Sequence, residues 1–257
     1  MTLSQYFNLT DTLARMSLKA DSAQYYLRYV WWVLEPLLFV AVFYLVFNVI
    51  LASGRADFLV FLMCGKLPFV WFSKSVNQAS NSLVTSGGLI GRIHIPKTLF
   101  PMAVIQEGLY KQSVVFALLI IVVLAYGYFP NLGWLYLIPI MLTQYLMIVC
   151  CGIIGAVIVC YVRDFGMLIS LFMTFLMFVS GIFWDVRNLA PAKADFVLAL
   201  NPVAFLLDAY RQVLMYQTTP DLGHLCLLLV VFGGMLALAV RMTNRASEAI
   251  ALKVITA

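Results

Sequence analysis

Acidic, nucleophilic and metal-binding residues are sparse in this chain and do not cluster in the sequence. Its eleven Asp and Glu residues form no DxD or DxxD pair of the kind that holds a metal-bound diphosphate donor. The two histidines, His94 and His224, lie far apart, and no HExxH motif is present. Enzymes show converging acids, bases or nucleophiles. The sequence therefore gives little support to an enzyme, such as an integral membrane transferase acting on a lipid-linked substrate.

Cofactor and metal sites are not indicated by the remaining motifs. The five cysteines lie in or beside apolar runs without CxxC spacing, which is typical of buried apolar residues. No GxxxxGK[ST] loop or GxSxG elbow occurs. The net charge of +5 comes from basic residues scattered around apolar runs, which favours membrane topology over nucleic-acid binding. We predict no cofactor, metal or nucleic acid for this chain.

Aromatic residues, which make up 14% of the chain, suggest a different chemistry. Rings near a bilayer surface often form an interfacial belt. The alternative is a conduit whose ring faces let sugars slide through CH–π contacts, with Asn77, Gln78, Asn81 and Ser82 bonding sugar hydroxyls. The candidate conduit residues are Tyr29, Trp31, Trp32, Phe69, Trp71 and Phe72.

Long apolar runs place these residues in a membrane protein. Hydrophobic residues make up 64% of the chain and its mean hydropathy is +0.99. A helix needs roughly 20 apolar residues to cross a bilayer. We therefore predict an all-α integral membrane protein with a single domain over residues 1–257 and about six spans. The expected spans are 31–52, 58–86, 113–129, 132–162, 165–184 and 222–240, so spans one to five lie within 31–184.

The second span, 58–86, has the weakest signal because Lys66, Pro68 and Lys74 interrupt it. Charged groups at bilayer depth face a bundle interior or a water-filled cavity. A hairpin that dips into the membrane and returns is the alternative. The following segment, 87–112, is rich in Gly and Pro and is expected to be a connector.

Two further segments are neither loops nor spans. Residues 1–30 repeat apolar side chains at spacings of three and four, which predicts an amphipathic helix at the cytoplasmic membrane interface. The segment 185–221 is too apolar for a solvated loop and too interrupted for a span. It predicts two short re-entrant helices, 196–200 and 203–215, separated by Asn201-Pro202, before span six and a cytoplasmic tail within 222–257.

The basic residues predict the orientation in the membrane. With both termini inside, the inner segments hold more Lys and Arg than the outer ones, as the positive-inside rule requires. The inner set is Arg15, Lys19, Arg28, Arg92, Lys97, Lys111, Arg163, Arg241, Arg245 and Lys253, against Arg55, Arg187, Lys193 and Arg211 outside.

Five sequence stretches together resemble one family of transporters. They are YLRYVWWVLEPLLFVAVFYLVF (26–47), LPFVWFSKSVNQASNSLV (67–84), LIGRIHIPKTLFPM (89–102), RDF (163–165) and FVSGIFWD…LNPVAFLLDAYRQVLM (178–215). In order and spacing these resemble the permease subunit of type-2 ATP-binding-cassette (ABC) exporters for lipid-linked polysaccharide, a group that includes O-antigen and capsule permeases. The WWVLEPLL form favours O-antigen export. The stretch LKADSAQYYLRY is less basic than the Arg-rich run that many relatives have there.

The resemblance implies a half-channel that forms a homodimer around the conduit and binds two copies of an ABC ATPase, which hold ATP and Mg²⁺. The N-terminal helix and the 87–100 connector would dock the ATPase. The coupling candidates there are Gly91, Ile93, His94, Pro96 and Lys97. The helices 193–200 and 203–215 would close the periplasmic end.

The expected function is export of an undecaprenyl-pyrophosphate-linked polysaccharide across the bacterial inner membrane. Membrane lipids are expected to surround the helices. Arg28 and Arg92 are the candidates for binding the pyrophosphate, because a guanidinium group matches phosphate geometry. The alternatives are an exporter of a drug or smaller lipid from the same superfamily, the transferase, and a structural subunit of a larger complex.

Overall fold

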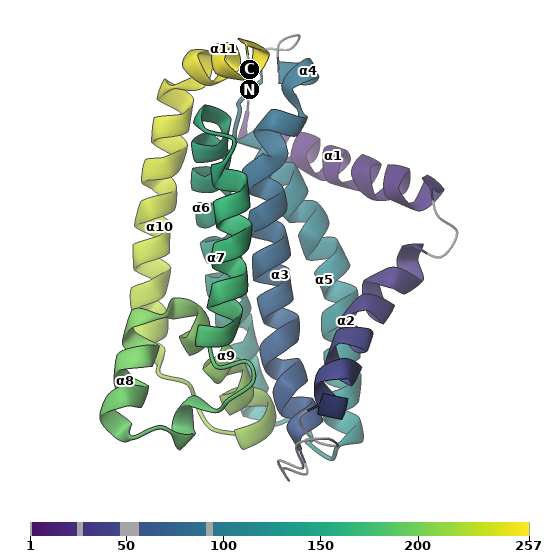
Figure 1. The fold of residues 1–257 in the computed structure, drawn as a ribbon, viewed down its shortest axis with the longest axis vertical. Helices are drawn as coiled ribbons and strands as arrows, with labels where there is room; N and C mark the ends of the chain where they lie inside the picture. The colour runs from purple at the N-terminus through teal and green to yellow at the C-terminus, as the bar shows by residue number, and fades with distance from the viewer. Residues whose placement is uncertain (1, 25–27, 47–56, 91–94, 257) are drawn as a thin grey trace.

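The computed structural model describes residues 2–24, 28–46, 57–90 and 95–256; the regular elements in this part of the chain are all helices, with no strand (Figure 1). Four helices are long and apolar enough to cross a membrane: Phe58–Thr85, Leu99–Ala125, Leu132–Tyr161 and Leu222–Arg245. Phe165–Val179 is a shorter apolar helix. The prediction of an all-α integral membrane protein is confirmed.

The bundle is formed by helices that run along the long axis of the molecule or are inclined to it (Figure 1). They are α2 (Arg28–Tyr44), α3 (Phe58–Thr85), α5 (Leu99–Ala125), α6 (Leu137–Tyr161), α7 (Phe165–Val179) and α10 (Leu222–Arg245). The short helices α4 (Gly87–Ile90) and α11 (Ser247–Thr256) lie at one end, called here the α11 end. The helices α8 (Pro191–Leu200) and α9 (Pro202–Arg211) lie at the opposite end, called the α9 end.

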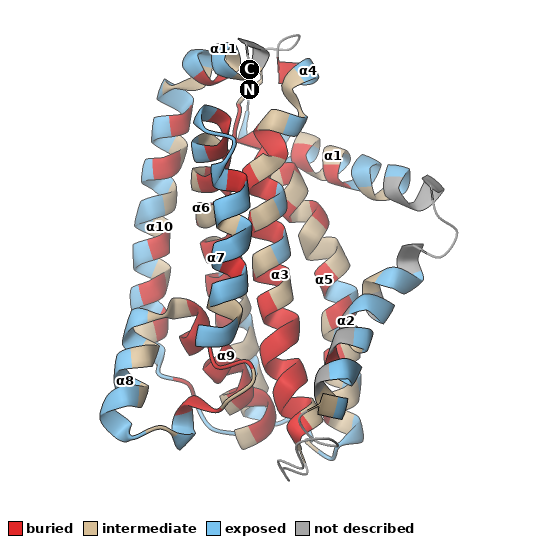
Figure 2. Cartoon of the chain, viewed as in Figure 1, coloured by how far each residue is buried: buried red, intermediate tan, exposed pale blue. Residues whose placement is uncertain are grey.

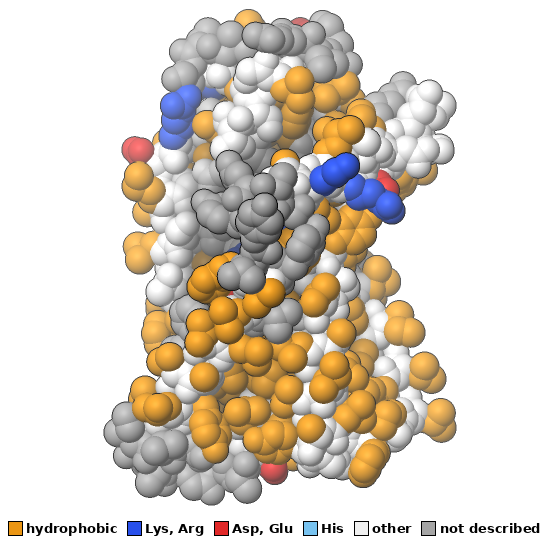
Figure 3. Space-filling model, turned by 90° about the vertical axis from the view of Figure 1, so that its right-hand side faces the viewer, with side chains coloured by type: hydrophobic (Ala, Val, Ile, Leu, Met, Phe, Trp, Pro, Cys, Tyr) orange, Lys and Arg blue, Asp and Glu red, His pale blue; other side chains and the backbone are white. Residues whose placement is uncertain are grey.

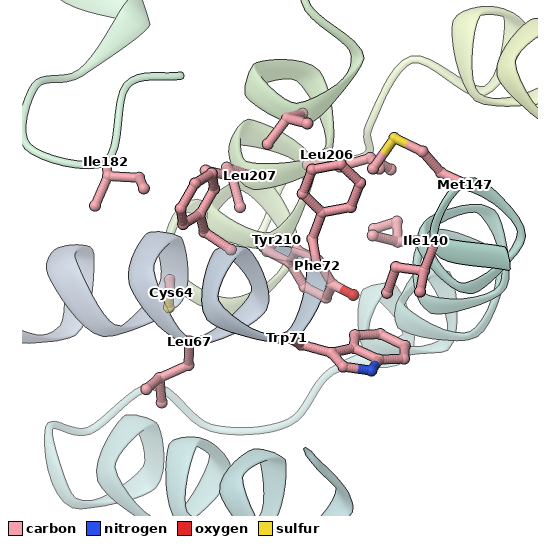
Figure 4. Packing of buried hydrophobic residues seen from close by; sticks show 14 of the residues in the cluster. Cys64, Leu67, Trp71, Phe72, Ile140, Met147, Ile182, Leu206, Leu207 and Tyr210 are labelled. Atoms are coloured by element: carbon pink, nitrogen blue, oxygen red, sulfur yellow. The ribbon is translucent and has the colours of Figure 1, made fainter. Parts of the chain in front are cut away.

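The centre of the bundle is α3, whose most apolar window is 78% buried, against 22% for α5 and α10. Figure 2 shows buried residues concentrated along α3 and α9, with exposed residues on α7, α8 and α10. Side chains from α3, α6 and α9 interleave in the core, including Trp71, Ile140 and Leu206 (Figure 4). The span with the weakest sequence signal is therefore the most enclosed of the four long apolar helices.

The dipping hairpin considered for 58–86 is wrong, because α3 is one continuous helix of 28 residues with Pro68 inside it. Proline removes a backbone donor and disturbs the helix ladder. Neighbouring helices bond the backbone at this point: Gln144 Nε2 donates to the carbonyl of Pro68 at 2.7 Å, and Gln112 Nε2 donates to that of Leu67 at 3.4 Å. These buried amides hold α3 between α5 and α6.

The expected connector 87–112 is wrong beyond residue 98, because α5 begins at Leu99. Pro101 falls within the first turn, where its missing N–H has no intrahelical partner to lose. Gly108 permits close packing, since a Cβ there would lie 2.7 Å from Ser75 Oγ on α3. Proline and glycine predicted a break in the helix here. In the structure, Pro101 lies in the first turn of α5, and Gly108 lets α5 pack closely against α3.

The segment 185–221 contains the two expected short helices, although α8 begins at Pro191, earlier than residue 196. Asn201 separates them and caps α9, accepting hydrogen bonds from the backbone N–H groups of Val203 and Ala204 at 3.1 Å. A π-helical turn, Gln212–Tyr216, follows α9. Their re-entrant position in a bilayer stays a prediction.

The N-terminal segment forms α1 (Leu3–Gln24), a 22-residue helix inclined to the bundle (Figure 1). Its buried residues, Thr10 and Ala14, lie one turn apart on the side that packs against α5. On the face of the molecule drawn in Figure 3, hydrophobic side chains cover the part toward the α9 end, and Lys and Arg lie toward the α11 end. This arrangement suits an apolar belt in lipid with basic residues at one membrane surface.

Candidate substrate conduit and coupling surface

The structure describes the side chains of five of the six candidate conduit residues and places them in two environments. Trp31 on α2 is 52% exposed and Trp32 is half-buried. Phe69, Trp71 and Phe72 on α3 are only 3%, 3% and 4% exposed. They are buried because α3 is the central helix. The side chain of Tyr29 lies outside the part of the chain that the structure describes.

A cavity of about 260 Å³ lies between α2, α3 and α5 and brings three of these residues together. Trp31, Trp32 and Trp71 line it, with polar groups from Lys74, Ser75, Gln78, Lys111 and Gln112. The Trp71 ring stacks on Tyr145 at 6.5 Å between centroids and meets Phe116 edge-on at 6.1 Å. Its indole N–H is buried without a hydrogen-bond partner among the described residues. Of the predicted polar set, only Gln78 lines this cavity.

A second cavity of about 330 Å³ lies between α2, α3 and α7 and is lined by Phe69 and Asn77. Lys66 Nζ, also in its lining, lies 2.9 Å from Met177 Sδ and 5.9 Å from the centre of the Phe69 ring. Ser170 of α7 donates to Asn77 Oδ1 at 2.9 Å. The polar side of α3, which weakened the sequence signal for this span, therefore faces two cavities. Charged groups within a membrane need such surroundings.

One ion pair belongs to both cavities. Lys74 Nζ lies 2.6 Å from Glu35 Oε2, and each side chain is about half exposed. Since Glu35 is on α2 and Lys74 on α3, the pair joins these helices where both cavities meet. Of the other predicted sugar-bonding residues, Asn81 Nδ2 donates to the carbonyl of Asn77 at 2.9 Å, and Ser82 Oγ donates to that of Ala79 at 2.6 Å.

The coupling candidates Pro96 and Lys97 line a third cavity, of about 690 Å³, near the α11 end. Its wall comes from α1, the segment 95–98, α5, α6 and α10. Lys97 is buried, and this burial lowers its pKa. Gly91, Arg92, Ile93 and His94 lie outside the described residues, as does the side chain of Arg28.

Polar contacts fasten α1 to α5 beside this cavity. Tyr6 donates its hydroxyl to Thr98 Oγ1 at 3.2 Å, and burial raises the Tyr6 pKa. Tyr110 donates its hydroxyl to Asp11, which also pairs with Arg15 at 2.8 Å. The hydrogen bond from Tyr110 lowers the pKa of Asp11, so this carboxylate is charged at neutral pH. Any displacement of α1 would therefore act directly on α5.

Arg211 on α9 was missed as a site residue, because the sequence reading counted it only as an outer basic residue. Its side chain is 1% exposed. The guanidinium donates to the carbonyls of Phe61, Gly181 and Ile182 at 3.3, 2.7 and 3.1 Å. It also lies 3.6 Å from the centre of the Phe61 ring. The sequence signal that could have identified Arg211 is its position inside an apolar stretch, because a charge there requires buried partners.

A second set of polar contacts surrounds Arg211 at the α9 end. Arg187 Nε lies 3.2 Å from Asp208 Oδ1, and Gln212 donates to the other oxygen of Asp208 at 2.6 Å. Tyr216 donates its hydroxyl to Asp185 at 2.7 Å. These contacts fix the turn that follows α7 against α9. Within the described residues, no group of three or more His, Cys, Asp and Glu could hold a metal ion.

Comparison with known proteins adds the functional context. No protein-family model matches the chain. An O-antigen export system permease protein, RfbA, of Klebsiella pneumoniae is 25% identical over 218 residues, covering 84% of this chain and 83% of the relative. The resemblance to polysaccharide-export permeases is confirmed. The Myxococcus xanthus protein of the same name is 26% identical over 230 residues, covering 89% and 88%. A second Klebsiella pneumoniae protein of this name is 25% identical over 83% of this chain and 82% of its own length.

Proposed function

We propose that this chain is the permease subunit of an ATP-driven exporter that moves an undecaprenyl-pyrophosphate-linked, O-antigen-like polysaccharide across the bacterial inner membrane. The observation that carries this proposal is the similarity to O-antigen export system permeases over more than four fifths of the chain. The long apolar helices supply the membrane domain that such a permease needs.

The assembly is a homodimer of this chain with two copies of an ABC ATPase at the cytoplasmic side. The sequence has no phosphate-binding loop, so ATP and Mg²⁺ bind to the partner. Both termini are cytoplasmic, in keeping with the excess of Lys and Arg in the segments at the α11 end. The docking surface consists of α1 and the connector, including Gly91, Ile93, His94, Pro96 and Lys97.

Coupling follows from the contacts of α1. Closure of the ATPase dimer moves α1 and the connector, and the Tyr6–Thr98 and Asp11–Tyr110 hydrogen bonds transmit this movement to α5. Because α5 packs against the central helix α3, the displacement reaches the two cavities that flank α3. This is a two-state movement that ATP binding biases.

The substrate passes the aromatic residues of α2 and α3, Tyr29, Trp31, Trp32, Phe69, Trp71 and Phe72, while Arg28 and Arg92 bind the pyrophosphate. The surface position of Trp31 supports contact with a passing glycan. Phe69, Trp71 and Phe72 contribute from inside the subunit, where Phe69 and Trp71 line the two cavities that flank α3.

The first test is purification of the tagged chain from native membranes in mild detergent, with the bound proteins identified by mass spectrometry. A stoichiometric ATPase with a phosphate-binding loop is expected. Isolation of the chain alone, or with biosynthetic enzymes only, would contradict ATP-driven export. Deleting the gene should leave full-length glycan in the cytoplasm. Normal glycan export with loss of another solute would favour a drug or small-lipid exporter.

The second test is Trp31→Ala, which should slow appearance of surface polysaccharide without lowering the amount of the permease in the membrane. The reason is that Trp31 is exposed, so its removal takes a ring from the conduit and not from the core. Leu38→Ala is the matched control, because Leu38 is an equally exposed apolar residue on the same helix. Equal export in the wild type and Trp31→Ala would exclude a conduit role for this ring.

A further inference from the structure

We propose that the 690 Å³ cavity near the α11 end binds one anionic phospholipid, whose phosphate contacts Lys97 and whose acyl chain lies against the apolar walls. Because α1 and α10 both contribute to these walls, the lipid would join the N-terminal helix to the bundle. The proposal goes beyond the proposed function and requires only that the chain lies in a membrane, so the two can fail separately.

The first argument is the order of polar and apolar groups along the cavity. On α10 the lining runs from Leu236 through Val240 to Asn244, which is about 12 Å along a helix. The polar residues Asn244 and Ser247 lie toward the α11 end, and Leu236 lies two turns farther from it. This length is close to half of a hydrocarbon core about 30 Å thick. The cavity therefore suits a lipid of one leaflet, with its headgroup at the α11 end.

The second argument is the apolar surface in the lining. Leu3 and Phe7, one turn apart on α1, are 75% and 55% exposed, whereas Val149 and Ile153 on α6 are buried. An acyl chain in the cavity would cover the first pair and pack against the second. Any lipid of the bilayer could supply such a chain, so the walls account for the chain, and the choice of headgroup depends on Lys97.

The third argument is the charge of Lys97, which is only 5% exposed. Its amine lies 3.5 Å from the carbonyl of Ile90, which is long for a hydrogen bond. Within the described residues, no Asp or Glu pairs with Lys97, although buried charges normally have a partner of opposite charge. The flexible lysine stem allows the amine to turn from Ile90 into the cavity that Lys97 lines.

The number of charges distinguishes a phospholipid from a carrier lipid. Lys97 is the one charged residue in the described part of the lining, and a phosphodiester supplies one negative charge to balance it. The diphosphate of a polyprenyl carrier would bring further negative charge without a described partner. Basic pockets between membrane helices bind anionic headgroups for the same electrostatic reason.

The test measures lipid binding to the purified full-length chain by native mass spectrometry. The probes are dioleoyl phosphatidylglycerol and dioleoyl phosphatidylethanolamine, which have the same acyl chains and differ in net charge. Phosphatidylglycerol should bind about 5-fold more tightly, the difference expected for one basic residue at a membrane surface. Lys97→Met removes the charge and keeps much of the apolar stem, so this variant should bind the two lipids equally.

Arg241→Met is the matched control for charge, because Arg241 is an exposed cation on α10 toward the same end and is not in the lining. It should keep the preference for phosphatidylglycerol. Val240→Phe adds volume to the cavity wall and should weaken the binding of both lipids. Leu238→Phe is its control, since Leu238 is 59% exposed and lies outside the lining, and it should bind both lipids like the wild type.

The proposal is overturned by equal binding of the two lipids to the wild type, by an unchanged preference in Lys97→Met, or by unchanged binding in Val240→Phe. An equal loss of preference in Arg241→Met and Lys97→Met would assign it to the general surface charge and would also overturn the site. Displacement of phosphatidylglycerol by a lower concentration of undecaprenyl diphosphate would assign the cavity to the carrier lipid instead. Co-purification of the ATPase with the wild-type chain tests the proposed function separately.

Discussion

The two ends of the molecule are held together in different ways. At the α9 end, the buried guanidinium of Arg211 bonds three backbone carbonyls from α3 and the turn after α7. At the α11 end, α1 is fastened to α5 by hydrogen bonds of Tyr6 and Tyr110, beside the half-exposed Asp11 carboxylate. Contacts in a low-dielectric interior are strong and costly to break, whereas exposed ones exchange readily with water.

This difference indicates where movement begins. A buried network in which each guanidinium nitrogen has an acceptor holds one arrangement, so we expect α9 and the turn at 180–188 to move with α3 as one unit. The hydrogen bonds that hold α1 to α5 are only part-buried, so a partner can displace this helix at a smaller cost. We therefore expect the α11 end to respond to the ATPase and the α9 end to act as a fixed closure until α3 itself moves.

The largest effect is expected for Arg211→Met. This change removes the guanidinium and leaves the carbonyls of Phe61, Gly181 and Ile182 without that donor. Each buried polar group that loses its partner costs about 1–3 kcal/mol, so a loss of about 3 kcal/mol or more in stability is expected. The measurement is the thermal unfolding midpoint in detergent. Lys193→Met, at an exposed position on α8, should leave the midpoint unchanged, and equal midpoints for the two variants would contradict a stabilising role of Arg211.

The next effect is expected for Gly65→Ala, which tests the space reserved for the guanidinium. A Cβ at Gly65 would collide with Arg211 Nη2, and overpacking of this kind typically costs about 1–3 kcal/mol. Gly234→Ala is the control, because a Cβ there meets nothing within 4 Å and alanine favours a helix. A lowered midpoint for Gly65→Ala with an unchanged or raised one for Gly234→Ala is the expected result. Equal midpoints for the two variants would show that the Arg211 side chain moves aside without a loss of stability.

At the α11 end, Asp11→Asn should lower transport while hardly changing the unfolding midpoint. The Tyr110 hydrogen bond depresses the pKa of Asp11, so its charged form is present above the ordinary pKa and is lost only as pH falls through the depressed value. At neutral pH the substitution therefore removes an existing charge. The measurement is substrate-stimulated ATP hydrolysis by the reconstituted complex. Full stimulation in Asp11→Asn would show that α1 is not coupled to α5 through this contact.

The smallest effect on stability is expected for Glu35→Gln, which breaks the ion pair between α2 and α3. Half-exposed pairs of this kind contribute about 0–1 kcal/mol, and each partner here is about half exposed. Export should nevertheless change, because the pair separates the two cavities beside α3. The measurement is the rate of surface polysaccharide appearance. The double exchange Glu35→Lys with Lys74→Glu should restore the wild-type rate. An unchanged rate in Glu35→Gln would exclude a role for the pair in export.

Much of the fold could be predicted because long apolar runs have one stable form in lipid, the helix. The short helices around Asn201-Pro202 were predictable for a related reason, since Asn and Pro mark a helix start. The segment 99–112 was not predictable, because Pro101 and Gly108 are breakers in isolation and become acceptable at a helix start and a close contact. For the candidate site, the sequence named the aromatic residues but not which of them are buried, and their role in transport stays a prediction.

By itself, the sequence determined that this is a helical membrane protein, because composition and the length of the hydrophobic runs settle that matter. Only the tertiary structure decided that α3 is the central helix, that Trp71 lines a cavity and that Arg211 is buried. Each depends on partners far away in the chain: Arg211 bonds Phe61 across 150 residues, and Gln144 reaches Pro68 across 76. An apolar helix presents a similar surface to lipid and to protein, so its neighbours are chosen by these few polar contacts and by packing.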